Sequence, residues 1–223
     1  MAQSGPLQEG GCLSLERELI ERVVREVVAW ARRFPVPVTV SNRHVHLSRE
    51  AVDLLFGREL TVRSYLRQPG QFAANETVRV LGPRGMLDSV RVVGPARRSC
   101  QVELSISDCY RIGVEPAIRD SGQHGGTPGV YLIGPRGILR LEEGVIVAQR
   151  HVHMAPEDAE AAGVGDGELV RIRHERGIRC GVLGGVLVRV SESYALECHL
   201  DVEEANALGV RNGDTVFLER GGI

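Results

Sequence analysis

The pattern of apolar positions changes once along the chain, near Pro35 and Pro37. Residues 1–13 are rich in Gly, Gln and Ser and show no periodicity, which indicates a loose tail. Ser14 can cap a helix, because apolar residues follow it at helical spacing. The apolar stripe consists of Leu15, Leu19, Val23, Val27 and Ala31, widened by Ile20, Val24 and Val28. We expect this N-terminal α-helix to end before Pro35 and to pack on the body of the protein.

Beyond residue 35, short apolar and β-branched runs are separated by Gly, Pro and Asp, which is typical of strands and turns. Strands are predicted at Thr77–Leu81, Gln101–Ile106, Val130–Gly134, Leu169–Arg173, Val186–Val190 and Thr215–Glu219. Short helices are predicted after Ser48, after Pro156 and from Asp201, where Asp201-x-x-Glu204 resembles a capping box. We therefore predict a mainly β fold, with two small β-barrel domains, short capping helices and the N-terminal α-helix.

One short segment occurs twice in the chain. Residues 38–46 and 145–153 each form an apolar run that ends in Arg-His-Val-His. Because successive strand side chains point to opposite faces, the two histidines of each His-x-His share one face and can bind one cation. Four of the seven histidines lie in these two triplets, so chance placement explains them poorly. The duplication predicts two metal ions; histidines with structural or substrate-contact roles are the alternative.

A second pair of segments extends the duplication. The histidine segments align at an offset of 107 residues, from His44 to His151, and residues 102–114 align with 198–210 at an offset of 96. This register places Glu103 opposite His199, so each repeat supplies two histidines and one further ligand. Three protein ligands with an open fourth position are typical of catalytic zinc. Taken singly, Glu103 could be a solvent-facing strand residue and His199 a hydrogen-bonded core histidine, but their matching positions favour ligands.

The repeats also predict the domain organisation. Residues 1–34 form the tail and helix, residues 35–143 the first β-barrel repeat and residues 144–223 the second. In an interleaved alternative, the strand at residues 36–43 joins the second barrel. The remaining histidines His124 and His174 match nothing between the repeats, and we interpret them as surface residues.

Composition narrows the class of partner. With 27 basic and 29 acidic residues, the net charge of −2 argues against a general nucleic-acid binder and favours an anionic small molecule. No apolar run approaches the length of a membrane span, and the N-terminus lacks a secretory pattern, so we expect a cytoplasmic protein with no membrane partner. Five cysteines without Cys-x-x-Cys spacing predict neither a disulfide framework nor a zinc ribbon.

Several separated motifs resemble one enzyme family, the phosphate propanoyltransferases, which are the phosphotransacylases of propanediol utilisation. The motifs are Val38–Ser48, Gln68-Pro69-Gly70-Gln71, Gly94-Pro95-Ala96-Arg97, Gln101-Val102-Glu103, Arg119-Asp120-Ser121-Gly122, Gly144–Met154 and Glu197–Asn206. The resemblance covers nearly everything after residue 35. It implies a zinc enzyme of two β-barrel domains that interconverts acyl-CoA and phosphate with acyl phosphate and free CoA.

The resemblance also implies roles for individual residues. One zinc ion would be held by His44, His46 and Glu103, with the CoA sulfur on its side, and the other by His151, His153 and His199. Arg97 would be the catalytic, phosphate-binding residue. The remaining pocket residues would be Gln68, Gln71, Gln101, Ser121 and Arg189. Cys100 departs from the family pattern, in which we expect threonine, but its similar size should leave the chemistry intact.

This reading predicts direct attack of phosphate on propionyl-CoA or acetyl-CoA, without an acyl-enzyme. A dizinc hydrolase such as a thioesterase is one alternative, although the sequence after His46 lacks the downstream Asp or His that metallohydrolases commonly add. A non-catalytic zinc-stabilised scaffold protein is another, and the three-ligand sets argue against it. We expect a homodimer. Some members of the family enter bacterial microcompartments through an amphipathic N-terminal extension, so packaging among shell or lumen proteins is the alternative to a free cytoplasmic enzyme.

Overall fold

The structure is a computed structural model that describes residues 17–24, 27–28 and 33–220. The chain divides into two units, before and after Pro35. Residues 17–24 and 27–28 are helical, in agreement with the predicted N-terminal helix, whereas Ser14, Leu15 and Ala31 lie outside the described residues. The apolar side chains of this helix are exposed, and its packing on the body stays a prediction.

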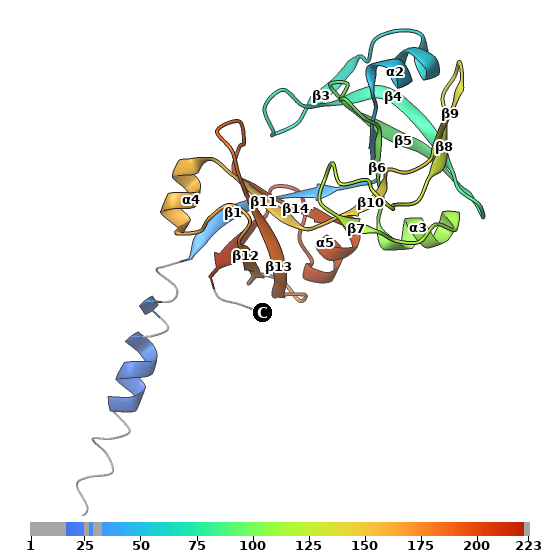
Figure 1. Cartoon of the computed structure of the whole chain (residues 1–223). Coiled ribbons are helices and arrows are strands. Elements are labelled where there is room, and N and C mark those ends of the chain that lie inside the picture. Colours follow the sequence, from blue (N-terminus) through green and yellow to red (C-terminus); the bar gives the residue numbers. More distant parts are fainter. Residues whose placement is uncertain (1–16, 25–26, 29–32, 221–223) are drawn as a thin grey trace, which may run out of the picture. The chain divides into compact units, whose positions relative to one another are not determined.

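Six strands close into a barrel (Figure 1). In spatial order they are β1 (Phe34–Ser41), β14 (Glu197–Asp201), β11 (His151–Met154), β13 (Gly181–Val190), β12 (Leu169–His174) and β15 (Thr215–Glu219). β1 runs parallel to β14, and backbone bonds between Val38 and the turn that precedes β15 complete the circle. Alternate side chains such as Val38, Val152 and Leu200 are buried, which gives the barrel an apolar interior.

The remaining strands form a nine-stranded open sheet that curls into a half-barrel. Its order is β7 (Ile118–Arg119), β10 (Val145–Ala148), β6 (Gln101–Glu103), β2 (His44–His46), β5 (Met86–Gly94), β4 (Phe72–Leu81), β8 (Val130–Ile133) and β9 (Ile138–Leu141), with β3 (Val62–Tyr65) paired to β4. Its core gathers Val45, Leu55, Val90, Val102 and Leu132, which are almost fully buried. The predicted mainly β fold is confirmed, with one barrel closed and the other open.

The two sheets exchange strands along the chain. β1, at the start of the first repeat, pairs with β14 in the closed barrel, whereas β10 pairs with β6 and β7 in the open sheet. The strands of one repeat therefore do not all belong to one sheet. The borders of the domains at 35–143 and 144–223 stay a prediction.

Four short helices carry matching caps. They are α2 (Arg49–Phe56), α3 (Ile106–Ile112), α4 (Pro156–Ala162) and α5 (Val202–Leu208), and each ends at a glycine in the left-handed conformation. Ser48 caps α2 and Asp201 caps α5 through side-chain acceptors, as the sequence predicted. None of the helices in the described part of the chain is long and apolar enough to cross a bilayer.

The predicted strand Gln101–Ile106 is wrong in its second half. β6 ends at Glu103, and Ser105 accepts a hydrogen bond from the backbone N–H of Asp108 to begin α3. The Ser-x-x-Asp spacing is an N-cap signal that apolar alternation obscured. Strands β3, β5, β7 and β9 were not predicted, because their polar residues and Gly-Pro turns weaken the period-2 pattern.

A buried carboxylate joins the start of β3 to β4 and yields a stability prediction. Glu76 accepts hydrogen bonds from Thr61 N at 2.9 Å and Thr61 Oγ1 at 3.0 Å, and Arg58 lies 3.3 Å away. Burial alone would raise the pKa of Glu76, but these contacts outweigh burial and lower it. Glu76→Ala should reduce the free energy of unfolding by about 2 kcal/mol in urea titrations, because the Thr61 N–H loses its partner.

The matched control is Glu59→Ala, which removes an exposed ion pair with Arg49 and should cost less than about 0.5 kcal/mol. Since folding lowers the pKa of Glu76, the cost of Glu76→Ala should be full above pH 4.5, its ordinary value, and shrink as the pH falls below it. Equal effects of the two substitutions at neutral pH would contradict this account.

Candidate active site

Each histidine strand pairs with the strand that carries the third candidate ligand. β2 lies antiparallel to β6 with His44 opposite Glu103, and β11 lies antiparallel to β14 with His151 opposite His199. The offsets of 107 and 96 residues thus describe real structural equivalence. The helices follow the same offsets, since α3 matches α5 and the first residue of α2 matches that of α4. Two copies of one strand-and-helix unit build the site.

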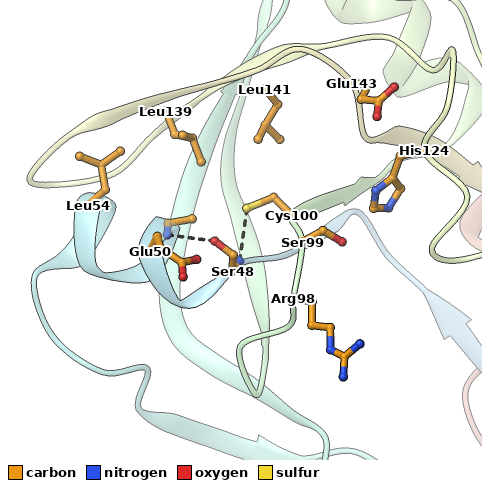
Figure 2. Close-up of a pocket in the computed structure, with 11 residues that line it drawn as sticks. Ser48, Glu50, Leu54, Arg98, Ser99, Cys100, His124, Leu139, Leu141 and Glu143 are labelled. Atoms are coloured by element: carbon orange, nitrogen blue, oxygen red, sulfur yellow. Dashed lines mark hydrogen bonds between the residues drawn. The ribbon is translucent and has the colours of Figure 1, made fainter.

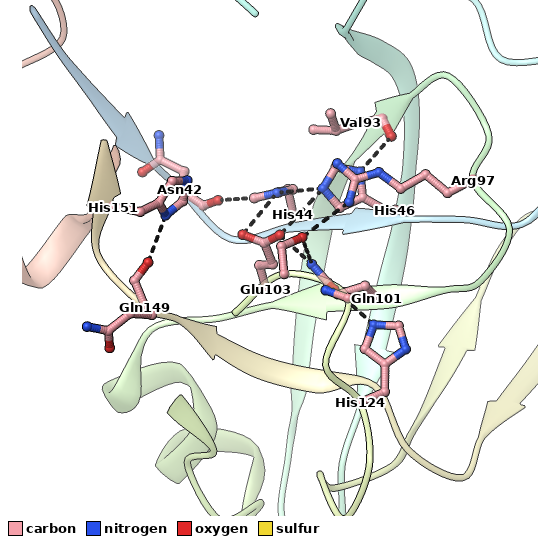
Figure 3. A network of polar contacts seen from close by, with 12 residues as sticks. Asn42, His44, His46, Val93, Arg97, Gln101, Glu103, His124, Gln149 and His151 are labelled. Carbon is pink, nitrogen blue, oxygen red and sulfur yellow. Dashed lines mark hydrogen bonds and ion pairs between the residues drawn. The ribbon is translucent and has the colours of Figure 1, made fainter. Parts of the chain in front are cut away.

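The first triad brings His44, His46 and Glu103 together (Figure 3). The Nε2 atoms of the two histidines are 3.2 Å apart and lie 3.4 and 3.5 Å from the oxygens of Glu103. Each Nδ1 instead faces a backbone carbonyl, that of Asn42 at 2.8 Å and that of Val93 at 3.2 Å. A proton on Nδ1 satisfies these carbonyls and leaves both Nε2 lone pairs directed at the carboxylate, which suits a shared cation.

Electrostatics separates the two histidines of the first triad. Burial disfavours the charged form of His44, but the Glu103 carboxylate outweighs burial and raises its pKa above the usual value. Burial lowers the pKa of His46 to about 4. Burial also opposes ionisation of Glu103, yet the two imidazoles hold its pKa well below the usual range. At neutral pH the triad therefore offers an ionised carboxylate and an uncharged His46.

The second triad consists of His151, His153 and His199, whose ring centroids lie 4.7 to 4.8 Å apart. His151 Nδ1 lies 2.8 Å from the carbonyl of Gln149, which repeats the contact of His44 with Asn42. Burial lowers the pKa of His151 to about 4 and that of His153 to about 2, and repulsion between the imidazoles adds to burial. His151 and His153 are thus uncharged nitrogen donors at neutral pH.

Both triads fit a metal ion. Neither ring nitrogen of His153 has a hydrogen-bond partner among the described residues, although both are buried. Leaving such groups unpaired costs about 1–3 kcal/mol each, and coordination of a cation would remove that cost for one nitrogen. In each triad one donor atom per residue lies within 4.8 Å of the others. Imidazole and carboxylate donors in sets of three are typical of catalytic zinc.

An ion pair supports the histidine strand in each repeat. Arg43 Nε lies 3.0 Å from Asp108 Oδ2 in α3, and Arg150 Nε lies 2.7 Å from Glu204 Oε1 in α5. The two acidic residues are again 96 positions apart. Each arginine precedes its His-x-His directly, so the pair fixes the strand end against the helix that follows the third ligand.

Two arginines give the site a positive potential. Arg97 N donates to Leu47 O at 2.8 Å, and its Nη1 lies 3.4 Å from Ser121 Oγ. Arg189 neighbours His153 across the β11–β13 pair, and its Cζ atom lies 5.9 Å from the centre of the Tyr194 ring. Partial burial and repulsion by Arg189 lower the pKa of Arg97. An anion between the two guanidinium groups would relieve this repulsion.

The predicted pocket glutamines differ in their surroundings. Gln101 is buried, with Nε2 donating to Glu103 Oε1 at 2.6 Å and to Ser121 Oγ at 2.9 Å. Gln68 is also buried, and its amide binds residues of the loop before β14. Gln71 is half-buried at the turn that leads into β4, where its carbonyl accepts from Leu66 N. The structure brings Gln101 and Ser121 to the first triad; the substrate-binding roles stay predictions.

Two histidines interpreted as surface residues are not exposed. His124 is half-buried, and its Nε2 lies 2.9 Å from Gln101 Oε1, so it belongs to the network around the first triad (Figure 3). His174 is buried at the end of β12. Both interpretations were wrong, because neither histidine has a counterpart in the other repeat and the contact of His124 with Gln101 joins residues 23 positions apart.

Sequence reasoning also missed Glu197 and Tyr194. Glu197 is 2% exposed and its Oε2 lies 3.0 Å from His199 Nε2. The Tyr194 ring stacks on His153 with centroids 4.0 Å apart. The offset of 96 could have revealed Glu197, because it aligns with Gln101. No local signal marks Tyr194.

A separate pocket of about 360 Å³ borders α2 and β9 (Figure 2). None of the six candidate ligands lines it. Cys100 points into this region, where its Sγ accepts a hydrogen bond from Ser48 N at 3.3 Å. The cysteine that replaces the expected threonine thus supports the start of α2.

Known proteins resemble almost the whole chain. A model of the family described as phosphate propanoyltransferase matches residues 37–211. The phosphate propanoyltransferase of Thermotoga maritima is 52% identical over 198 residues, which cover 87% of this chain and 94% of the relative. Those of Rhodopseudomonas palustris and Salmonella typhimurium are 46% and 43% identical, covering 92% and 89% of this chain and 99% and 95% of the relatives. The resemblance drawn from the motifs is confirmed.

The contrast between His44 and His46 predicts the pH dependence of zinc binding at the first triad. Because the pKa of His44 is raised and that of His46 is lowered to about 4, one proton competes with the metal at pH values between the pKa of His46 and the raised pKa of His44. In a His151→Ala protein that keeps only the first triad, zinc affinity should fall by up to about tenfold per pH unit in this range. Calorimetric titrations in buffers of different protonation enthalpy measure the released proton; a pH-independent affinity would contradict the assignment.

Proposed function

Because the chain belongs to the phosphate propanoyltransferase family and is an acyltransferase, we propose that it interconverts short-chain acyl-CoA and phosphate with acyl phosphate and CoA at a dizinc site. Propionyl-CoA and acetyl-CoA are the proposed substrates. The observation that carries the proposal is the pair of convergent triads beside Arg97 and Arg189. It combines metal donors with an anion site in one place.

The six candidate ligands would hold the two zinc ions, one ion per triad. When bound, zinc would supply Lewis acidity for the thioester carbonyl and affinity for thiolate sulfur. The protein prepares both triads by burial, which keeps His46, His151 and His153 uncharged at neutral pH. Backbone carbonyls at Asn42 and Gln149 orient His44 and His151, so little reorganisation accompanies binding.

Arg97 would bind the phosphate. Its guanidinium presents paired N–H donors that match phosphate oxygens, and Arg189 adds a second positive charge. Ser121 Oγ lies 3.4 Å from Arg97 Nη1 and can hold the arginine or contact phosphate itself. A backbone bond from Arg97 N to Leu47 O holds the backbone of Arg97 beside the residue that follows His46. The phosphate dianion is thereby held for attack on the thioester carbon.

The reaction is a direct displacement. A phosphate oxygen forms a bond to the acyl carbon, the carbon–sulfur bond breaks, and the electron pair leaves with the CoA thiolate. An acyl-enzyme on Cys109 or Cys198 is disfavoured, because burial raises the pKa of Cys109 to about 11 and also raises that of Cys198. Cys100 contacts the cap of α2 in the separate pocket.

Pocket residues complete the proposed site. Gln101 would hold Glu103 and Ser121 in place through its two N–H donors, and its Oε1 accepts from Gly122 N at 2.7 Å. Gln68 and Gln71 belong to the turn that leads into β4. Gln71 has the more accessible side chain and would contact substrate, whereas Gln68 would act through its contacts with the loop before β14.

A homodimer in the cytoplasm is the proposed assembly and location. Packaging in a bacterial microcompartment is the alternative, and it would use the apolar stripe of the N-terminal helix. Leu19, Ile20, Val23 and Val24 are exposed on that helix. Sedimentation of the purified protein and of a variant lacking residues 1–30 would measure the assembly independently of the chemistry.

Release of free thiol from propionyl-CoA and acetyl-CoA tests the proposed activity. The zinc-loaded protein should release thiol only with inorganic phosphate, a chelator should abolish release, and added zinc should restore it. Release without phosphate would instead establish a zinc thioesterase. No release from either substrate, together with tightly held zinc, would favour the scaffold protein.

Arg97→Ala tests the phosphate site. We expect it to keep the fold and both zinc ions but to lower phosphate-dependent turnover by about a hundredfold or more, because a transition-state contact is lost. Arg98→Ala is the matched control, since Arg98 is exposed like Arg97 but lines the separate pocket. Wild-type turnover in Arg97→Ala would refute the role of the arginine.

His44→Ala and His151→Ala test the dizinc assignment. Each should lose one of two zinc ions by elemental analysis and lose most of the activity, since each removes one donor of a three-ligand set. His174→Ala serves as the control, because His174 lies outside both triads. Two zinc ions retained in either triad variant would overturn the assignment.

A further inference from the structure

Arg189 carries a positive charge that no acidic side chain neutralises. It is half-buried on β13, opposite His153 in the β11–β13 pair. Among the residues that the structure describes, its guanidinium makes no ion pair and no hydrogen bond. Arg43 and Arg150, in contrast, each pair with an acidic residue of a neighbouring helix. The charge of Arg189 is therefore available to a ligand.

A second arginine opposes this position of the guanidinium. Burial lowers the pKa of Arg97, and repulsion by Arg189 lowers it further. Like charges favour side-chain rotamers that separate them, and a long arginine side chain has many such rotamers. Without an attractive contact, Arg189 would turn away from Arg97 into solvent. Some other group must hold it at the site.

The ring of Tyr194 supplies an attractive contact. Arg189 Cζ lies 5.9 Å from the centre of this ring, within the range of about 6 Å over which an aromatic face attracts a guanidinium. The attraction comes from the quadrupole of the ring, which adds no negative charge. The tyrosine can therefore hold Arg189 without neutralising it. A carboxylate in the same place would cancel the charge that an anionic ligand needs.

Tyr194 is itself fixed in place. Its ring stacks on His153 with centroids 4.0 Å apart and planes 17° from parallel. The tyrosine lies in the loop between β13 and β14, where Ser191 N donates to the last residue of β11 at 3.0 Å. On the other side of the tyrosine, Ala195 is bound through both its N–H and its carbonyl by the amide of Gln68. The ring therefore presents a rigid surface to the arginine.

The pair of arginine and tyrosine occurs in the second repeat alone. At the offset of 96 residues, Arg189 corresponds to Val93 and Tyr194 to Arg98. The β2–β5 and β11–β13 pairs keep the same register at this offset, so an apolar side chain occupies the position of Arg189 in the first repeat. The strand pair thus forms without a charge there. The arginine serves a ligand and is not needed to build the sheet.

We propose that Tyr194 is a positioning residue that holds the guanidinium of Arg189 at the anion site through its aromatic ring. The inference rests on the proposed function, because it takes Arg189 as a phosphate-binding residue beside Arg97. The ring and not the hydroxyl makes the contact. Phenylalanine should therefore replace Tyr194 in this role, whereas leucine should not.

Binding of inorganic phosphate to the zinc-loaded protein, measured by calorimetry, tests the role of the ring without turnover. Tyr194→Phe should bind phosphate within about twofold of the wild type, and Tyr194→Leu about three- to tenfold more weakly, as expected for one lost cation–π contact. Tyr110→Leu is the matched control, since Tyr110 is an exposed tyrosine of α3. Wild-type affinity in Tyr194→Leu would refute the proposal. Equal weakening in Tyr194→Phe would assign the contact to the hydroxyl and refute it as well.

A double-mutant cycle separates positioning of Arg189 from a general effect on the structure. Arg189→Ala alone should weaken phosphate binding, and adding Tyr194→Leu to it should cause no further loss, because the residue that the ring holds is already absent. The zinc content of all variants is measured alongside. If leucine lowered phosphate affinity by the same factor with and without Arg189, the tyrosine would act independently of the arginine and the proposal would be wrong.

Turnover distinguishes failure of this inference from failure of the proposed function. In the thiol-release assay Tyr194→Leu should raise the apparent KM for phosphate about three- to tenfold and leave that for propionyl-CoA within about twofold. Coupled phosphate binding by Tyr194 and Arg189 without thiol release would support this inference and refute the acyl transfer. Thiol release without coupling would refute this inference alone. A wild type that binds no phosphate would overturn the anion site itself.

Discussion

The site depends on the register between two short antiparallel strand pairs. His44 faces Glu103 across β2 and β6, and His151 faces His199 across β11 and β14. A slip of one residue in either pair would turn the third ligand to the opposite face of its sheet and bury it in the apolar core. Val45 and Val152, which separate the histidines, are fully buried and hold the register from that face. The core of each sheet therefore fixes the geometry of a polar site that lies on its other face.

Ion pairs and hydrogen bonds also stabilise this register. The ion pairs Arg43–Asp108 and Arg150–Glu204 tie each histidine strand to the helix after the third ligand. Carbonyls orient the imidazoles, and Gln101 and Glu197 complete the contacts of the third ligands. Buried polar groups of this kind are costly when unpaired and strongly orienting when paired. Because β1 pairs in the closed barrel and β10 pairs in the open sheet, the chain passes between the two sheets and connects both copies of the strand-and-helix unit.

Much of this arrangement was predictable from residues close together in the chain. The His-x-His strands, the capped helices after Ser48 and Asp201, and the register of Glu103 with His199 follow from period, cap chemistry and duplication. The helix after Ser105 escaped prediction because an apolar run concealed its cap. His124 contacts Gln101, which is 23 residues away in sequence, and Gln68 contacts Ala195, which is 127 residues away. No local pattern along the chain predicts such contacts.

The mainly β fold, the two sets of candidate ligands and membership of an acyltransferase family follow from the amino-acid sequence alone, because each depends on side-chain alternation, repeat spacing or motifs along the chain. Three features are visible only once the chain is folded. One barrel closes while the other stays open, Arg97 and Arg189 repel one another at the site, and Glu197 lies beside His199 Nε2. These features arise from hydrogen bonds, burial and electrostatic repulsion between segments far apart in sequence, and their free energies exist only once the strands have paired.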